Sequence, residues 1–106
     1  MSVHVIKRYT REHKATGNWE DWRSHFVAFD GKNAEIEALT CMQSLAYGFI
    51  SDSMKEDMTI SIDQDQPHII KVYATKGEVT ESVTYIRTNR PNDYPNYSSM
   101  SEHNEV

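Results

Sequence analysis

Three carboxylates stand where strands and a helix are expected to begin or end. Asp30 follows an apolar strand segment, Glu35 falls in the first turn of a predicted helix, and Asp63 closes a regularly alternating strand. If the helix packs across the sheet, these side chains could converge on a divalent metal ion, because hard cations prefer oxygen ligands. Each also has an ordinary role: Asp30 begins a turn, Glu35 complements the helix dipole and Asp63 ends a strand.

The order of a strand over residues 25–29, a helix bearing Glu35 and a strand ending in Asp63 resembles part of the ribonuclease H-like fold. In that fold, acidic residues at such places hold metal, so the resemblance implies a metal-dependent hydrolase of this type. It covers roughly residues 25 to 65 and includes no diagnostic motif. The chain has no acidic residue in its first predicted strand and too few elements for the full fold, so this reading stays a third hypothesis.

The other reactive residue types do not fall into patterns typical of catalysis. The five histidines are His4, His13, His25, His68 and His103. None of them forms a helical i, i+4 pair or a zinc spacing. Cys41 has no histidine near it in the sequence to activate its thiol. Residues 63–66 begin like a calcium loop but lack its glycine and its final glutamate. We therefore predict that the chain is not an enzyme and has no catalytic residue, no metal ligand and no cofactor.

Two features suit contact with another macromolecule. The first is the segment Trp19-Glu20-Asp21-Trp22, because tryptophan is enriched in the most strongly binding parts of interfaces. The second is an acidic zone within residues 52–65, in which the predicted interaction residues are Glu56, Asp57, Asp63 and Asp65. This zone could face a basic partner. The plainer alternatives are tryptophans that close the end of the core and an ordinary solvated loop.

A second hypothesis is a small-molecule or nucleic-acid binder. In this reading the two tryptophans and further aromatic residues stack on rings, while arginines meet phosphates. The additional residues predicted for such a site are Arg8, Tyr9, Arg11, Arg23 and Tyr85. Residues 1–33 carry six Lys and Arg against four Asp and Glu, whereas residues 34–106 carry five against twelve. The basic charge is thus confined to one end and modest, so nucleic acid is disfavoured as a partner.

Six elements are expected to position these residues. Strands are predicted over 3–9, 25–29, 58–62, 69–75 and 79–87 from their β-branched content and alternation. A helix is predicted over 34–50, with Ile36, Leu39, Met42, Ala46, Phe49 and Ile50 on its apolar face. Residues 10–24 are expected to form a long polar loop or an irregular hairpin connection, and 89–106 a flexible polar tail. The prediction is an α+β domain over residues 1–88. It has a mainly antiparallel sheet of four to five strands and one helix on one face, in the order β-β-α-β-β-β.

Composition and charge limit the class of function. The chain has 106 residues, a net charge of −5 and one cysteine, which indicates one small domain without an internal disulfide. No run is long enough to span a membrane, so a cytoplasmic protein without membrane contact is expected. Small acidic domains are typical of inhibitors and adaptors, including those of bacteriophages. We therefore predict a protein-binding module with a basic partner, and homodimerisation through an uncovered sheet face is a further possibility.

Overall fold

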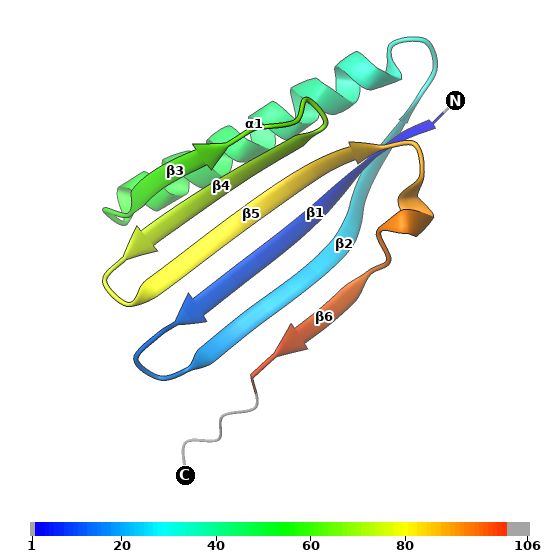
Figure 1. The fold of residues 1–106 in the computed structure, drawn as a ribbon. Helices are drawn as coiled ribbons and strands as arrows, with labels where there is room; N and C mark the ends of the chain where they lie inside the picture. Colours follow the sequence, from blue (N-terminus) through cyan, green and yellow to red (C-terminus); the bar gives the residue numbers. More distant parts are fainter. Residues whose placement is uncertain (1, 102–106) are drawn as a thin grey trace.

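A six-stranded antiparallel sheet carries a single helix on one face (Figure 1). The computed structural model describes residues 2–101. Its elements are β1 (Ser2–His13), β2 (Asn18–Asp30), α1 (Ala34–Lys55), β3 (Thr59–Asp63), β4 (Ile69–Lys76), β5 (Val79–Thr88), the 3-10 helix η1 (Pro91–Asp93) and β6 (Tyr97–Met100). The strands lie in the order β3-β4-β5-β1-β2-β6. The predicted α+β class, antiparallel sheet and single helix are confirmed, and the described chain has six strands where four to five were predicted.

β1 and β2 form a hairpin that is much longer than the sequence predicted. They pair along their whole length, so residues 10–13 and 18–24 are strand and not part of a polar loop. The tight connection uses Gly17, whose φ is 76° and whose amide donates to the His13 carbonyl oxygen over 2.9 Å. The prediction was wrong because the polar side chains of this segment interact across the strands, which stabilises strand pairing without an apolar pattern.

A β-bulge in β2 decides which face of the sheet each residue near the hairpin turn occupies. Val5 pairs with Val27, and the next residue, Ile6, pairs with His25. Phe26 therefore has no partner of its own in β1. Because successive side chains of a strand point to opposite faces, this extra residue reverses the faces of all residues between the bulge and the turn. We name the face that α1 packs on the helix side and the other face the open face.

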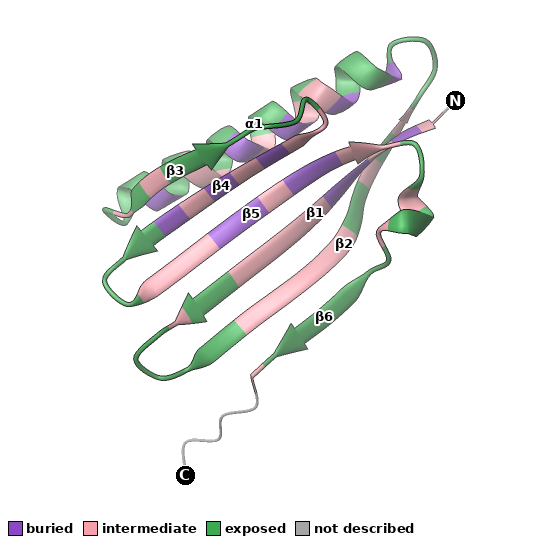
Figure 2. Ribbon diagram, in the orientation of Figure 1, coloured by how far each residue is buried: buried purple, intermediate pink, exposed green. Residues whose placement is uncertain are grey.

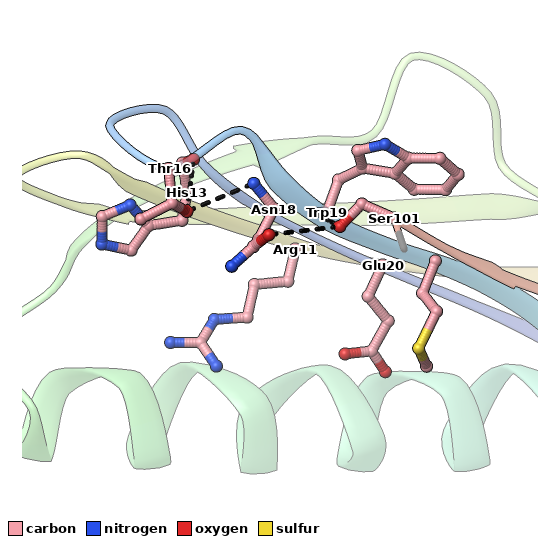
Figure 3. Close-up of a pocket in the computed structure, with 8 residues that line it drawn as sticks. Arg11, His13, Thr16, Asn18, Trp19, Glu20 and Ser101 are labelled. Atoms are coloured by element: carbon pink, nitrogen blue, oxygen red, sulfur yellow. Dashed lines mark hydrogen bonds between the residues drawn. The ribbon is translucent and has the colours of Figure 1, made fainter. Parts of the chain in front are cut away.

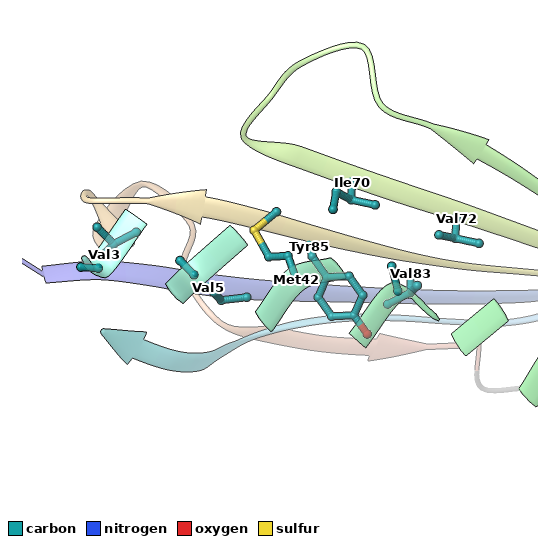
Figure 4. Close-up of a cluster of buried hydrophobic side chains, with 10 residues drawn as sticks. Val3, Val5, Met42, Ile70, Val72, Val83 and Tyr85 are labelled. Atoms are coloured by element: carbon teal, nitrogen blue, oxygen red, sulfur yellow. The ribbon is translucent and has the colours of Figure 1, made fainter. Parts of the chain in front are cut away.

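The core lies between α1 and the sheet (Figure 4). It consists of Val3, Val5, Ala34, Ala38, Met42, Ala46, Ile70, Val72, Val83 and Tyr85. Small alanine side chains on α1 let the helix approach the sheet closely. Met42 is fully buried, whereas Ile36, which the predicted apolar face included, is 68% exposed. The other end of the predicted apolar face is confirmed, because Ala46 is buried and Phe49 and Ile50 pack against the core, while in the first turns Ala34 and Ala38 are buried in place of Ile36. None of the helices in residues 2–101 is long and apolar enough to cross a membrane.

α1 covers only part of the sheet. It packs on β3, β4, β5 and one end of the β1–β2 hairpin, and the other end of the hairpin extends past it (Figure 1). Buried residues lie mainly in β4, β5 and the first half of β1, while β2 and β6 are half-buried or exposed (Figure 2). The part of the sheet near the β1–β2 turn is therefore a single layer.

Part of the predicted flexible tail has regular structure. β6 pairs antiparallel with β2 and forms one edge of the sheet. Its Tyr97 hydroxyl donates to the Asp21 carboxylate over 2.9 Å. The sequence shows no apolar period here because β6 is held by backbone pairing and polar contacts, and all four of its residues are exposed. Residues 102–106, the rest of the predicted tail, lie outside the described residues.

Candidate functional site

The segment from Trp19 to Trp22 lies inside strand β2 and does not form an interaction loop. Residues three apart in a strand point to opposite faces, so the two indoles do not share one surface. Trp19 and Asp21 lie on the open face, where Trp19 is 44% exposed. Trp22 and Glu20 lie on the helix side, where Trp22 is half-buried.

On the open face, Asp21 is the centre of a small polar network. Arg8 donates to both carboxylate oxygens, from Nε to Oδ1 over 3.0 Å and from Nη2 to Oδ2 over 2.8 Å. The hydrogen bonds from Arg8, followed by the one from Tyr97, lower the pKa of Asp21. The guanidinium of Arg23 lies 5.1 Å from the ring centre of Tyr97 and 5.5 Å from that of Tyr94. We name Arg8, Asp21, Arg23, Tyr94 and Tyr97 the open-face cluster.

On the helix side, Trp22 and Tyr9 form an aromatic pair in the part of the sheet that α1 leaves uncovered. Their ring centres are 5.7 Å apart, and the Lys7 ammonium lies 5.4 Å from the Trp22 ring centre. Trp22 Nε1 donates to the Glu20 carboxylate over 3.1 Å, and the Tyr9 hydroxyl donates to Glu81. Burial, and then the hydrogen bond to Glu81, raises the pKa of Tyr9. The polar groups of this pair thus have partners inside the protein.

Two hollows flank the end of the hairpin. The hollow in Figure 3 has a volume of about 420 Å³ and is lined in part by Trp19 and Arg11. The other has a volume of about 560 Å³ and is lined in part by Trp22 and Arg23. Each hollow therefore contains one indole and one arginine, and neither gathers both tryptophans.

The residues predicted for ligand binding are divided among three places. Arg8 and Arg23 lie on the open face, and Tyr9 and Arg11 lie on the helix side. Tyr85 is buried beneath α1, and this burial raises its pKa to about 12. A ligand whose ring stacks on these aromatic residues would therefore not have all three arginines within reach of its phosphate groups.

The predicted acidic residues form two groups, one at each end of β3. Glu56 and Asp57 precede the strand, and Asp63 and Asp65 lie at its end and just beyond. All four are exposed, and the ion pairs found within residues 2–101 include none of them. Five residues of strand separate the two groups by roughly 15 Å. Asp57 also terminates α1 with a φ of 58°, a conformation that Asp tolerates better than most residues.

Four large apolar side chains, whose exposure the sequence did not reveal, lie on α1 and β3, with exposed polar residues between those of α1. Ile36, Tyr47 and Met54 lie on one side of α1. Tyr47 follows Ile36 by eleven residues, about three helical turns, and Met54 follows Tyr47 by seven residues, about two turns. They are 68%, 73% and 62% exposed, and Ile62 of β3 is 59% exposed. Tyr47 and Ile62 both line a hollow of about 220 Å³ between α1 and β3. We name these four residues the α1–β3 strip.

Asp30, Glu35 and Asp63 do not form a carboxylate cluster. Within residues 2–101, no group of three or more His, Cys, Asp and Glu side chains is placed to hold a metal ion. Asp30 ends β2 and accepts a hydrogen bond from the Ser2 hydroxyl, whereas Asp63 ends β3. β2 and β3 are four positions apart in the sheet, a distance of about 19 Å. The convergence on which the ribonuclease H-like interpretation depended is absent from this part of the chain.

The structure pairs two histidines that the sequence did not connect. His4 of β1 and His25 of β2 are 21 residues apart in the chain, yet His4 Nδ1 and His25 Nε2 lie 2.8 Å apart. The hairpin register could have revealed that these two histidines are neighbours, but only if the bulge at Phe26 had been anticipated.

Comparisons of the chain with protein-family models, curated proteins and solved structures give no match. The functional conclusions therefore rest on the geometry described above.

Proposed function

We propose that this protein is a small inhibitor- or adaptor-type module that binds a protein partner through the α1–β3 strip. The observation that carries the proposal is the exposure of four large apolar side chains, Ile36, Tyr47, Met54 and Ile62, on adjacent elements. Tyr47 and Ile62 share the hollow between α1 and β3, and exposed large apolar side chains grouped on one face, among polar residues, are typical of protein-binding sites. Tyrosine and methionine are also among the residue types that interfaces favour.

The charges beside the strip indicate the chemistry of the partner. Exposed carboxylates lie at both ends of β3, with Glu56 and Asp57 at one end and Asp63 and Asp65 at the other. A segment with an apolar centre and flanking Lys or Arg would complement this arrangement. β3 is also an edge strand, so an extended segment could pair with its free backbone groups.

A second copy of the chain is a poorer occupant than a basic partner. Homodimerisation through the α1–β3 strip would bring the acidic groups of two copies near one another, and like charges across an interface are unfavourable. The proposal includes the cytoplasmic setting expected from the sequence. Cys41 is a free thiol, and a lone unpaired cysteine is compatible with a reducing compartment. Burial raises the pKa of this thiol, which makes it less reactive.

The test is to select binders from a random peptide library against the immobilised chain and to measure their affinity by fluorescence anisotropy. We expect the recovered peptides to have apolar residues flanked by Lys or Arg. The double variant Tyr47→Ser with Ile62→Ser should weaken binding at least about tenfold. The charge reversal Asp63→Lys with Asp65→Lys should also weaken binding, and added salt should weaken binding to the unaltered chain.

The matched control is Trp19→Ser with Phe26→Ser, which removes two exposed aromatic side chains away from the strip. This variant should bind as tightly as the unaltered chain. Peptides that lose binding only with the control variant would show that the α1–β3 strip is not the binding surface. Peptides without basic residues would show that the acidic groups do not select the partner. Sedimentation velocity of the unaltered chain should show a monomer, and a dimer abolished by the Tyr47 and Ile62 changes would show that the strip binds a second copy.

A further inference from the structure

The two histidines of the β1–β2 hairpin lie together on the open face. His4 Nδ1 and His25 Nε2 are 2.8 Å apart, so one ring nitrogen donates and the other accepts. The ring centres are 5.0 Å apart and the ring planes are inclined by 63°. Both rings are accessible to solvent, His25 more than His4.

The bulge at Phe26 brings these rings together. With a regular register beyond the Val5–Val27 pair, His25 would lie opposite Lys7 on the helix side. The extra residue instead places it opposite Ile6 on the open face, diagonally across from His4. Bulges often redirect a side chain in this way next to functional sites. The backbone N–H of His25 also donates to the Asn96 side-chain oxygen over 2.9 Å, which fixes the strand at this point.

We propose that His4 and His25 form a two-histidine site for a divalent transition-metal ion of the Cu²⁺, Ni²⁺ or Zn²⁺ class. Neutral imidazole is a preferred ligand for these ions. Two metal–nitrogen bonds of about 2.0–2.1 Å that meet at a right angle place their nitrogens about 2.9 Å apart. The observed 2.8 Å is close to this spacing. To bind one ion, both rings would turn from facing each other, and the donating nitrogen would present its lone pair as the other tautomer of the neutral ring.

The remaining coordination positions of the ion would be open. Within residues 2–101, no third His, Cys, Asp or Glu side chain joins the pair to complete a metal site. His25 also lines a hollow of about 330 Å³ bounded by the segment that includes η1, with Tyr94 and Asn96 on its wall. Water or a donor atom of a small molecule would occupy the open positions. This site is separate from the α1–β3 strip, and the proposal does not depend on the proposed function.

The test uses the untagged chain with Cys41→Ser, which removes the thiol as a competing ligand. Isothermal titration with CuCl₂ and with ZnCl₂ should show one ion per chain and tighter binding of Cu²⁺. His4→Ala and His25→Ala should each weaken binding by about a hundredfold, because two linked ligands bind far more tightly than either alone. His68→Ala, in the loop before β4, is the matched control and should leave the affinity unchanged.

An affinity in either single variant as high as that of the parent chain would overturn the two-histidine site. A second readout does not depend on the variants: substoichiometric Cu²⁺ should broaden the imidazole proton resonances of His4 and His25 together, before those of the other histidines. Broadening of only one of the two rings would also overturn the proposal.

Discussion

At the scale of single residues, the open-face cluster makes the folded state sensitive to acid. Arg8 lowers the pKa of Asp21 below its ordinary value of 3.8, so the folded state releases this proton more readily than the unfolded state. The Arg8–Asp21 ion pair therefore makes its full contribution to the stability of the fold above the unfolded-state pKa of Asp, about 4. This contribution is lost as the pH falls through the lowered pKa of Asp21 in the folded state. We expect Asp21→Asn to reduce the free energy of unfolding by about 0.5–1 kcal/mol at neutral pH.

Urea unfolding across the acid range measures this effect. The difference between wild type and Asp21→Asn should shrink below about pH 4 and vanish at lower pH. Asp93→Asn is the control, because the Arg90–Asp93 pair is more exposed and joins residues of one short turn. A difference for Asp21→Asn that did not change with pH would contradict the role of the ion pair.

The hydroxyl of Tyr9 is a second residue whose effect can be isolated. It donates to Glu81 in a half-buried position, and Tyr9→Phe leaves that carboxylate without the donor. We expect a loss of about 1 kcal/mol in the free energy of unfolding. Tyr47→Phe removes the same hydroxyl from an exposed ring and should change stability by less than about 0.5 kcal/mol. Equal effects in the two variants would show that the Tyr9–Glu81 contact does not stabilise the fold.

At the scale of elements, two apolar residues of α1 should respond very differently to the same truncation. Met42 is fully buried in the core, so Met42→Ala should cost about 2–4 kcal/mol. Ile36 is mostly exposed, so Ile36→Ala should change stability by less than about 0.5 kcal/mol. Thermal and urea unfolding of both variants measure this contrast. A large loss for Ile36→Ala would mean that the Ile36 side chain packs against the protein, as the sequence predicted, and is not solvent-exposed.

The sequence predicted the helix and most strands because their apolar residues repeat with helical or strand periods. Of the apolar face predicted for α1, Met42 and Ala46 are buried and Phe49 and Ile50 pack against the core, but Ile36 is exposed because Ala34 and Ala38 form the buried side of the first turns. The sequence also predicted a loop or irregular connection for the polar half of the hairpin, since those residues are stabilised across strands rather than by a core. The acidic residues around β3 can be read from the sequence and their role in binding stays a prediction, whereas the exposure of the α1–β3 strip depends on the orientation of α1.

At the scale of the whole molecule, β6 should add stability without determining the fold. It contributes four residue pairs with β2 at one edge of the sheet, each worth roughly 0.2–1 kcal/mol. Truncation after Pro95 should therefore lower the free energy of unfolding by about 1–3 kcal/mol and leave the far-ultraviolet circular dichroism otherwise native. Hydrogen exchange should accelerate in the β2 amides that face β6. Complete unfolding of the truncated chain would show that β6 is required for folding.

The molecule is elongated, with extents of 53 × 27 × 21 Å and a radius of gyration of 15.2 Å. A compact chain of this length would have a radius of about 13 Å. The difference comes from the hairpin, which extends past α1 and places its aromatic and charged groups far from the core (Figure 1). Neither the composition nor the periodicity of the sequence indicates this elongated shape, because the shape depends on where α1 crosses the sheet.

The single-layered end of the sheet has a thermodynamic consequence. Its strands are held by backbone pairing, by polar contacts and by the half-buried Tyr9–Trp22 pair, so opening it exposes less apolar surface to water than opening the core. The heat-capacity change of unfolding comes mainly from such surface, and it should therefore reside chiefly in the part beneath α1. Cooling weakens the hydrophobic contribution to that part but has less effect on the hairpin end. The protein thus joins two regions whose stabilities follow different curves with temperature.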